Sequence, residues 1–120
     1  MILADTSVWV DHLRSGDARL INLLESGGVL IHPFIIGEIS LGNLGQRDVV
    51  LQALRALPSA AIATEAELSI VIEQQRLFGL GIRYVDAHLL AATQLTPDAS
   101  LWTRDRRLLE AATRMGLAGA

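Results

Sequence analysis

Cysteine and lysine are both absent from this chain of 120 residues. The lack of cysteine excludes disulfides, thiolate metal sites and cysteine nucleophiles. The lack of lysine excludes Schiff-base chemistry and a P-loop phosphate site. Aromatic residues make up only 4% of the chain, so the sequence shows no platform on which nucleic-acid bases could stack.

Long apolar runs are also missing, since none approaches the roughly 18–20 residues that a membrane span needs. No basic residue precedes the first apolar run, so the beginning of the chain does not resemble a signal peptide. The length suits one domain, and a hydrophobic content of 51% is enough to build its core. We therefore expect a single domain over residues 1–120 in a cytoplasmic protein that makes no membrane contact.

The charge pattern limits how nucleic acid could bind. All 10 basic residues are arginine, and the net charge of −3 gives an overall field that would not attract nucleic acid. A nucleic-acid substrate would need a local cluster of arginines or a bound cation. Arg104 and Arg106 are candidate contacts to RNA phosphates, whereas Arg107 and Arg114 fit a solvated helix face slightly better.

Short apolar segments alternate with helical patterns along the chain. Strands are predicted over residues 1–4, 29–31, 60–63 and 100–103. Helices are predicted over residues 7–13, from Asp17 to Gly27, and over 33–41, 46–57, 64–78, 84–95 and 105–115, with Ser7 as an N-cap and a capping box at Thr64 and Glu67. This alternation predicts an α/β fold in which helices cover both faces of a mostly parallel sheet.

Four carboxylates lie in apolar or boundary contexts: Asp5, Glu38, Asp86 and Asp105. Most of the other acids fall on polar helix faces or caps, where solvation explains them. Ligands of parallel sheets bind beyond the carboxyl ends of the strands. Asp5 and Asp105 each follow a predicted strand, so they are expected to share one edge of the sheet.

Each of these acids also has a structural explanation. Asp5 could end a strand at a turn, and Asp86 and Asp105 could complement helix N-termini. Glu38 is harder to explain, because it is the only charge between Val29 and Gln46. A charge in an apolar helix needs a partner, which could be water, a distant arginine or a metal ion.

Convergence of the four acids would favour a bound cation. Two carboxylates about 5 Å apart repel by roughly 3 kcal/mol at an effective dielectric constant of about 20. Oxygen ligands without cysteine or a positioned histidine favour Mg²⁺, for which Mn²⁺ can substitute. The hydroxyls of Thr6, Ser7 and Thr103 would then orient the carboxylates. His12, His32 and His88 share no metal-binding spacing and are expected to be structural or exposed.

Four segments resemble, in order, the motifs of PIN domains, and most closely those of VapC toxins from bacterial type II toxin–antitoxin systems. The segments are LADTSVWVD, IGEISLG, VDAHLLAA and LWTRD. After Asp105 the chain reads RRLLEAA, where many members of the family have a phenylalanine a few residues on. This difference affects core packing rather than chemistry.

The resemblance implies a three-layer α/β/α sandwich and a Mg²⁺-dependent endoribonuclease. By this resemblance, the acids that form the metal site are Asp5, Glu38, Asp86 and Asp105. Asp5 and Asp86 are expected to bind the ion directly, and Glu38 and Asp105 through water or on a second ion. The resemblance further implies a homodimer, with larger assemblies, and a VapB-type antitoxin that places a basic side chain in the acidic pocket.

Two other functions are also compatible with the sequence. The chain could be a PIN-fold binding module of weak activity that acts with an antitoxin on operator DNA, although the acid set is intact. It could also be a phosphoryl-transfer domain of the receiver or haloacid dehalogenase type, which likewise places an aspartate after the first strand. Such domains need a lysine in the site, and this chain has none.

Overall fold

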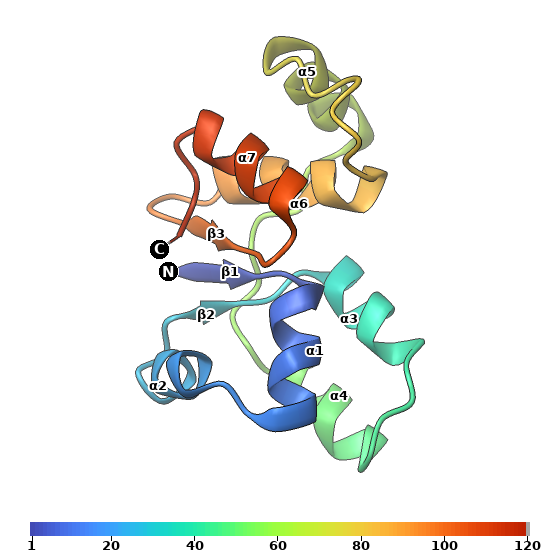
Figure 1. Ribbon diagram of the computed structural model, residues 1–120, viewed down its shortest axis with the longest axis vertical. Coiled ribbons are helices and arrows are strands. Elements are labelled where there is room, and N and C mark those ends of the chain that lie inside the picture. The colour runs from blue at the N-terminus through green and yellow to red at the C-terminus, as the bar shows by residue number, and fades with distance from the viewer. Residues whose placement is uncertain (120) are drawn as a thin grey trace.

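A computed structural model describes residues 1–119 and centres on a parallel sheet (Figure 1). Its strands are β1 (Ile2–Ala4), β2 (Val29–Leu30) and β3 (Ser100–Trp102), in the order β2-β1-β3. In the central strand, Leu3 pairs with Leu30 on one side and with Leu101 on the other. The strands are short and apolar because both faces of the sheet are covered.

Helices form the layers on either side of the sheet. They are α1 (Thr6–Ser15), α2 (Ala18–Glu25), α3 (Pro33–Ser40), α4 (Arg47–Arg55), α5 (Glu65–Gln74), α6 (Tyr84–Leu95) and α7 (Arg106–Arg114). Helices α1 to α4 lie on one side of the sheet, and α6 and α7 lie on the other, with α5 beyond α6 (Figure 1). The predicted three-layer α/β/α architecture is confirmed.

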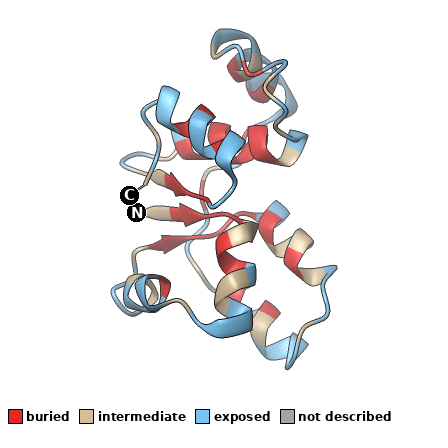
Figure 2. Cartoon of the chain, in the orientation of Figure 1, coloured by how far each residue is buried: buried red, intermediate tan, exposed pale blue. Residues whose placement is uncertain are grey.

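The core lies between these layers, and the outward helix faces are exposed (Figure 2). Leu3 and Leu101 in the sheet and Leu90 in α6 are fully buried. Every residue of α6 from Asp86 to Thr93 is buried, which explains why this helix reads as apolar almost throughout. No helix among residues 1–119 combines the length and the hydropathy that crossing a bilayer requires.

The prediction of a strand over residues 60–63 is wrong. Ile31 forms a single parallel bridge with Ser59, and the Ala60 N–H donates to the Ile31 carbonyl. The next amide, that of Ala61, donates to the Thr96 Oγ1 hydroxyl instead of a backbone carbonyl. The strand ladder does not continue, because its next donor would be residue 33, which is a proline without an N–H and the first residue of α3.

Two helix boundaries also differ from the predictions. Asp5, not Ser7, is the N-cap of α1, because its carboxylate accepts the Val8 N–H. The capping box of Thr64 and Glu67 is present, but α5 ends at Gln74, about one turn before the predicted end. The other predicted helices and strands form within a few residues of their expected bounds.

The strand order places one crevice at the carboxyl end of β1. The chain leaves β1 for β2 on one side, and β3 later joins β1 on the other side. This reversal is the point at which open parallel sheets bind ligands. Asp5 is the first residue after β1 and therefore lies at this point.

Candidate metal centre

Asp5 is a buried carboxylate with several hydrogen bonds. Only 5% of the surface of Asp5 is exposed to solvent. The Ser7 hydroxyl donates to Oδ1 at 2.5 Å, and the Thr103 hydroxyl donates to Oδ2 at 2.5 Å. The Val8 N–H also donates to Oδ1. Burial raises the pKa of Asp5, and the hydrogen bonds from Ser7, Thr103 and Val8 act in the opposite direction.

The two hydroxyls that hold Asp5 also connect it to the turn between β3 and α7. Ser7 Oγ accepts the Arg104 N–H at 3.0 Å, and Thr103 Oγ1 accepts the Asp105 N–H at 3.0 Å. Each hydroxyl therefore donates to the carboxylate and accepts from the backbone of a distant segment. The predicted orienting role of Ser7 and Thr103 is consistent with these bonds.

Glu38 enters the same region from α3, where its side chain is 24% exposed. The Thr6 hydroxyl donates to Glu38 Oε1 at 2.6 Å. Thr6 therefore orients Glu38 and not Asp5, its neighbour in sequence. Arg83 Nη1 lies 3.6 Å from Glu38 Oε2. The partner that the sequence required for Glu38 is thus a threonine hydroxyl together with an arginine distant in the chain.

Asp86 lies in the first turn of α6 and is 5% exposed. Its Oδ2 accepts the backbone N–H of Arg83 at 3.0 Å, which caps the helix. Its Oδ1 lies 3.6 Å from Arg83 Nη2. One guanidinium therefore lies beside both Glu38 and Asp86 and supplies positive charge between them.

Asp105 is the N-cap of α7, and its Oδ1 accepts the Leu108 N–H at 3.0 Å. It is the one exposed carboxylate of the four. A single small pocket is lined by all four predicted acids together with Thr6, Ser7, Arg83 and Leu89. Helix capping explains part of the placement of Asp86 and Asp105, but it does not explain why the four acids face one pocket.

The donor set of the pocket fits a hard divalent cation. Its acids offer carboxylate oxygens, and hydroxyls already fix the orientation of two of them. Within residues 1–119, no three acids or histidines lie close enough to form a ready-made metal cluster. Arg83 already occupies a cationic position between two of the acids, so binding an ion would require Arg83 to move and the carboxylates to approach one another.

The two arginines predicted to contact RNA lie in different environments. Arg104 forms ion pairs with Asp11 at 2.8 Å and with Asp17 at 2.7 Å, so its charge is largely neutralised. Arg106 is exposed, and its Nε lies 3.7 Å from Glu110. Arg106 lines a hollow next to the acidic pocket, whereas Arg104 does not.

The histidines have structural contacts. His12 Nδ1 accepts the Asp17 N–H, and His32 Nδ1 accepts the Phe34 N–H at the start of α3. Burial, with a smaller effect from His88, lowers the pKa of His32 to about 4. None of the three histidines lines the acidic pocket.

Comparison with known proteins identifies the family. No protein-family model matches the chain. Two relatives, both named Ribonuclease VapC32 and from two strains of Mycobacterium tuberculosis, are each 46% identical over 118 residues. These alignments cover 98% of this chain and 95% of each relative. The chain belongs to the VapC family of PIN-domain ribonuclease toxins.

Membership of the VapC family agrees with the order and the structural context of the four acidic motifs. The sequence analysis missed the one basic residue that lines the pocket, Arg83. The available signal was its position three residues before Asp86, at the start of an otherwise apolar helix. An arginine at that spacing is within reach of a carboxylate in the first turn.

Replacement of Asp5 by asparagine is expected to stabilise the metal-free protein at neutral pH. Because burial raises the folded pKa of Asp5, its favourable contribution is complete below the unfolded pKa and is lost as pH rises through the folded pKa. In buffer with EDTA, Asp5→Asn should therefore be more stable than the wild type at about pH 7, and the difference should shrink toward about pH 4.

Urea denaturation across this pH range measures the difference. Glu25→Gln, which removes an exposed carboxylate on α2, is the matched control and should show no such trend. A stability difference for Asp5→Asn that does not change with pH would contradict the assignment of a buried, costly charge to Asp5.

Proposed function

We propose that this VapC-type toxin is a Mg²⁺-dependent endoribonuclease that cleaves single-stranded or structured RNA and is inhibited by a VapB-type antitoxin. The observation that carries the proposal is the single pocket lined by Asp5, Glu38, Asp86 and Asp105. The relatives of this chain are named ribonucleases, which supports RNA as the substrate. Mn²⁺ is expected to replace Mg²⁺, because both prefer oxygen ligands.

Asp5 and Asp86 are proposed as the direct ligands. They are the two most buried of the four acids, and they lie beside the carboxyl end of the central strand and at the start of α6. Glu38 and Asp105 are proposed to act through water or on a second ion, since both are more exposed. A bound Mg²⁺ would supply Lewis-acid polarisation of a phosphate oxygen and activation of the attacking water.

The residues of the chain have separate roles in the proposed hydrolysis. Ser7 and Thr103 keep both oxygens of Asp5 in fixed directions, and Thr6 does the same for one oxygen of Glu38. Asp105 uses Oδ1 for its helix cap, so Oδ2 is left to accept a proton from water at the mouth of the pocket. The oxygen of that water would then bond to phosphorus while the bond from phosphorus to the leaving ribose oxygen breaks, and the ribose oxygen would take a proton from solvent.

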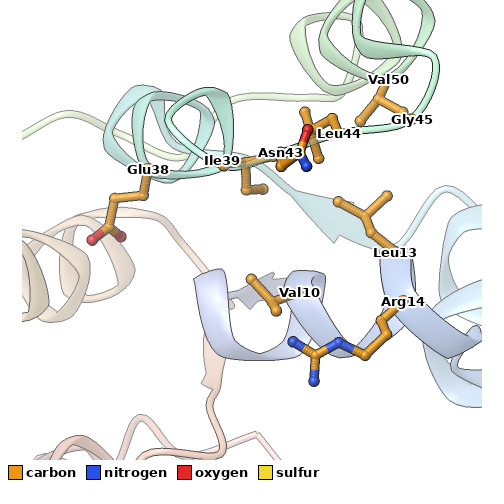
Figure 3. A pocket seen from close by; sticks show the side chains of 10 residues that line it. Val10, Leu13, Arg14, Glu38, Ile39, Asn43, Leu44, Gly45 and Val50 are labelled. Carbon is orange, nitrogen blue, oxygen red and sulfur yellow. The ribbon is translucent and has the colours of Figure 1, made fainter.

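An apolar groove supports the proposed antitoxin partner. It lies between α1 and the segment joining α3 to α4, and Val10, Leu13 and Ile39 line it (Figure 3). Glu38, an acid of the pocket, lies at one end of the groove (Figure 3). An apolar peptide in the groove could therefore place a basic side chain near the acids, where charge complementarity would favour it.

A homodimer, with larger toxin–antitoxin assemblies, is also part of the proposal. Ile70, Phe78 and Tyr84 are each more than half exposed. They belong to α5, to the segment after it and to the start of α6. Exposed apolar side chains of this size favour a covered surface over a solvated one.

Purified protein is expected to cleave single-stranded RNA in the presence of Mg²⁺ and to stop when EDTA is added. Asp5→Asn should be folded and inactive, because the central carboxylate is lost while its shape is kept. Gel analysis of labelled RNA measures this, with Glu25→Gln as an active control. Wild-type protein that binds no divalent ion and cuts no RNA would favour a binding module that acts with its antitoxin on operator DNA.

Removal of the arginine in the pocket is expected to strengthen binding of the divalent ion. Arg83 lies 3.6 Å from Glu38 and 3.6 Å from Asp86, so it competes with any ion for these carboxylates. Its side chain is 68% exposed, and solvent therefore limits the effect. Arg83→Gln should raise the affinity for Mn²⁺ several-fold in a calorimetric titration without RNA.

The matched control for this titration is Arg55→Gln, which removes an exposed arginine from α4. It changes the net charge by the same amount but should leave the affinity for Mn²⁺ close to that of the wild type. Equal or weaker binding of Mn²⁺ by Arg83→Gln would contradict the competition.

A further inference from the structure

A second hollow adjoins the acidic pocket and is rich in arginine. Its lining consists of Gly81, Arg83, Asp86, Asp105, Arg106 and Arg107. Asp86 and Asp105 line both hollows, so the two share a wall. We call the surface formed by Gly81, Arg106 and Arg107 the arginine shelf. A group bound on this shelf would lie next to the acids of the proposed catalytic site.

The position of Arg107 depends on a glycine. Gly81 has a φ angle of +74°, which residues with a side chain rarely adopt. A Cβ atom built at Gly81 would overlap the guanidinium of Arg107. The Arg107 side chain therefore lies directly against the backbone of Gly81, in space that only glycine leaves open. Arg107 is therefore held against Gly81 and does not extend freely into solvent.

The other end of α7 is attached to the same loop. Arg114 Nη2 donates to the carbonyl of Gln75 at 2.7 Å and also to that of Arg76 at 3.3 Å. The loop from Gln75 to Arg83 is thus connected to α7 through Arg114 at one end and contacts Arg107 at the other. These contacts fix the distance between the loop and the helix and so preserve the shelf.

Arg107 differs from its neighbours in its ion pairing. Arg83 lies beside Glu38 and Asp86, and Arg106 lies beside Glu110. Within residues 1–119, no carboxylate lies within ion-pair distance of Arg107. Its positive charge is therefore available to an anion from solution, although two carboxylates of the site lie in the same hollow.

We infer that the arginine shelf is a binding subsite for an RNA phosphate that flanks the phosphate to be cleaved. Arg107, set against Gly81, is the main contact, and Arg106 adds a second positive charge. This inference rests on the proposed function and deepens it, because it names how the RNA strand is held beside the acids. It also changes the interpretation of Arg107, which the sequence pattern placed on a solvated helix face.

The test measures binding of a labelled single-stranded RNA by fluorescence anisotropy in EDTA, where no cleavage is expected. Arg107→Gln should weaken binding several-fold. It should also reduce the slope of log K against log salt concentration by about 0.7, the value for one phosphate contact on a single strand. Arg55→Gln removes an exposed arginine from α4, which does not line the shelf, and should change neither quantity.

A pair of glycine variants tests the geometry without changing the charge. Gly81→Ala would displace the Arg107 side chain, whereas Gly79→Ala meets nothing within 4 Å. Both glycines have a φ angle of +74°, so the two variants carry the same backbone strain. Gly81→Ala should weaken RNA binding in the same direction as Arg107→Gln, and Gly79→Ala should bind as the wild type does.

Several results would overturn the subsite. The first is that Arg107→Gln binds RNA as tightly as the wild type does. The second is that Arg107→Gln weakens RNA binding but Gly81→Ala does not. The third is that Gly81→Ala and Gly79→Ala change RNA binding equally. Failure of the proposed function is distinguished by RNA cleavage with Mg²⁺. If the wild type cleaves RNA but Arg107→Gln leaves both binding and KM unchanged, the shelf is wrong and the nuclease stands. If the wild type cleaves no RNA, the proposed function fails first.

Discussion

The structure depends on one buried carboxylate, that of Asp5, at the carboxyl end of the central strand. Burial makes its charge costly, and the hydroxyls of Ser7 and Thr103 reduce that cost by donating to its two oxygens. The same hydroxyls accept amides from the turn between β3 and α7. The first and last parts of the chain are therefore joined through this carboxylate, and the join brings Asp105 to the pocket. A feature that costs stability thus also organises the site.

Stability and function use the same groups in this molecule. Asp5, Asp86 and Asp105 each accept an amide at the start of a helix, and each also lines the acidic pocket. Arg83 places positive charge between Glu38 and Asp86 and so lowers the repulsion that the acids would otherwise feel. In the metal-free protein the guanidinium of Arg83 therefore supplies the positive charge of the pocket, and a divalent ion would take its place.

The sequence predicted the fold, and it predicted that the four acids lie together, because both follow local patterns. Aspartates that follow parallel strands lie at the same edge of the sheet, so the proximity of Asp5 and Asp105 could be predicted from the sequence alone. The position of Arg83 beside Glu38 could not, because it depends on how α3 and α6 approach one another. The contact between Gly81 and Arg107 could not be predicted either, because the sequence does not show which side chain packs against a glycine with a positive φ angle. The predicted strand at residues 60–63 was wrong because the pairing with Ile31 ends at Pro33, which has no N–H to donate and begins α3.

The four acids line one pocket, and we propose that a divalent ion relieves their mutual repulsion. The most direct measurement is the melting temperature of the wild type and of Asp5→Asn, each with EDTA and with millimolar Mg²⁺. An ion that binds only the folded state raises the melting temperature by mass action. We expect Mg²⁺ to raise the melting temperature clearly for the wild type and little or not at all for Asp5→Asn. A wild-type melting temperature that Mg²⁺ leaves unchanged, or an equal rise in both proteins, would contradict the proposal.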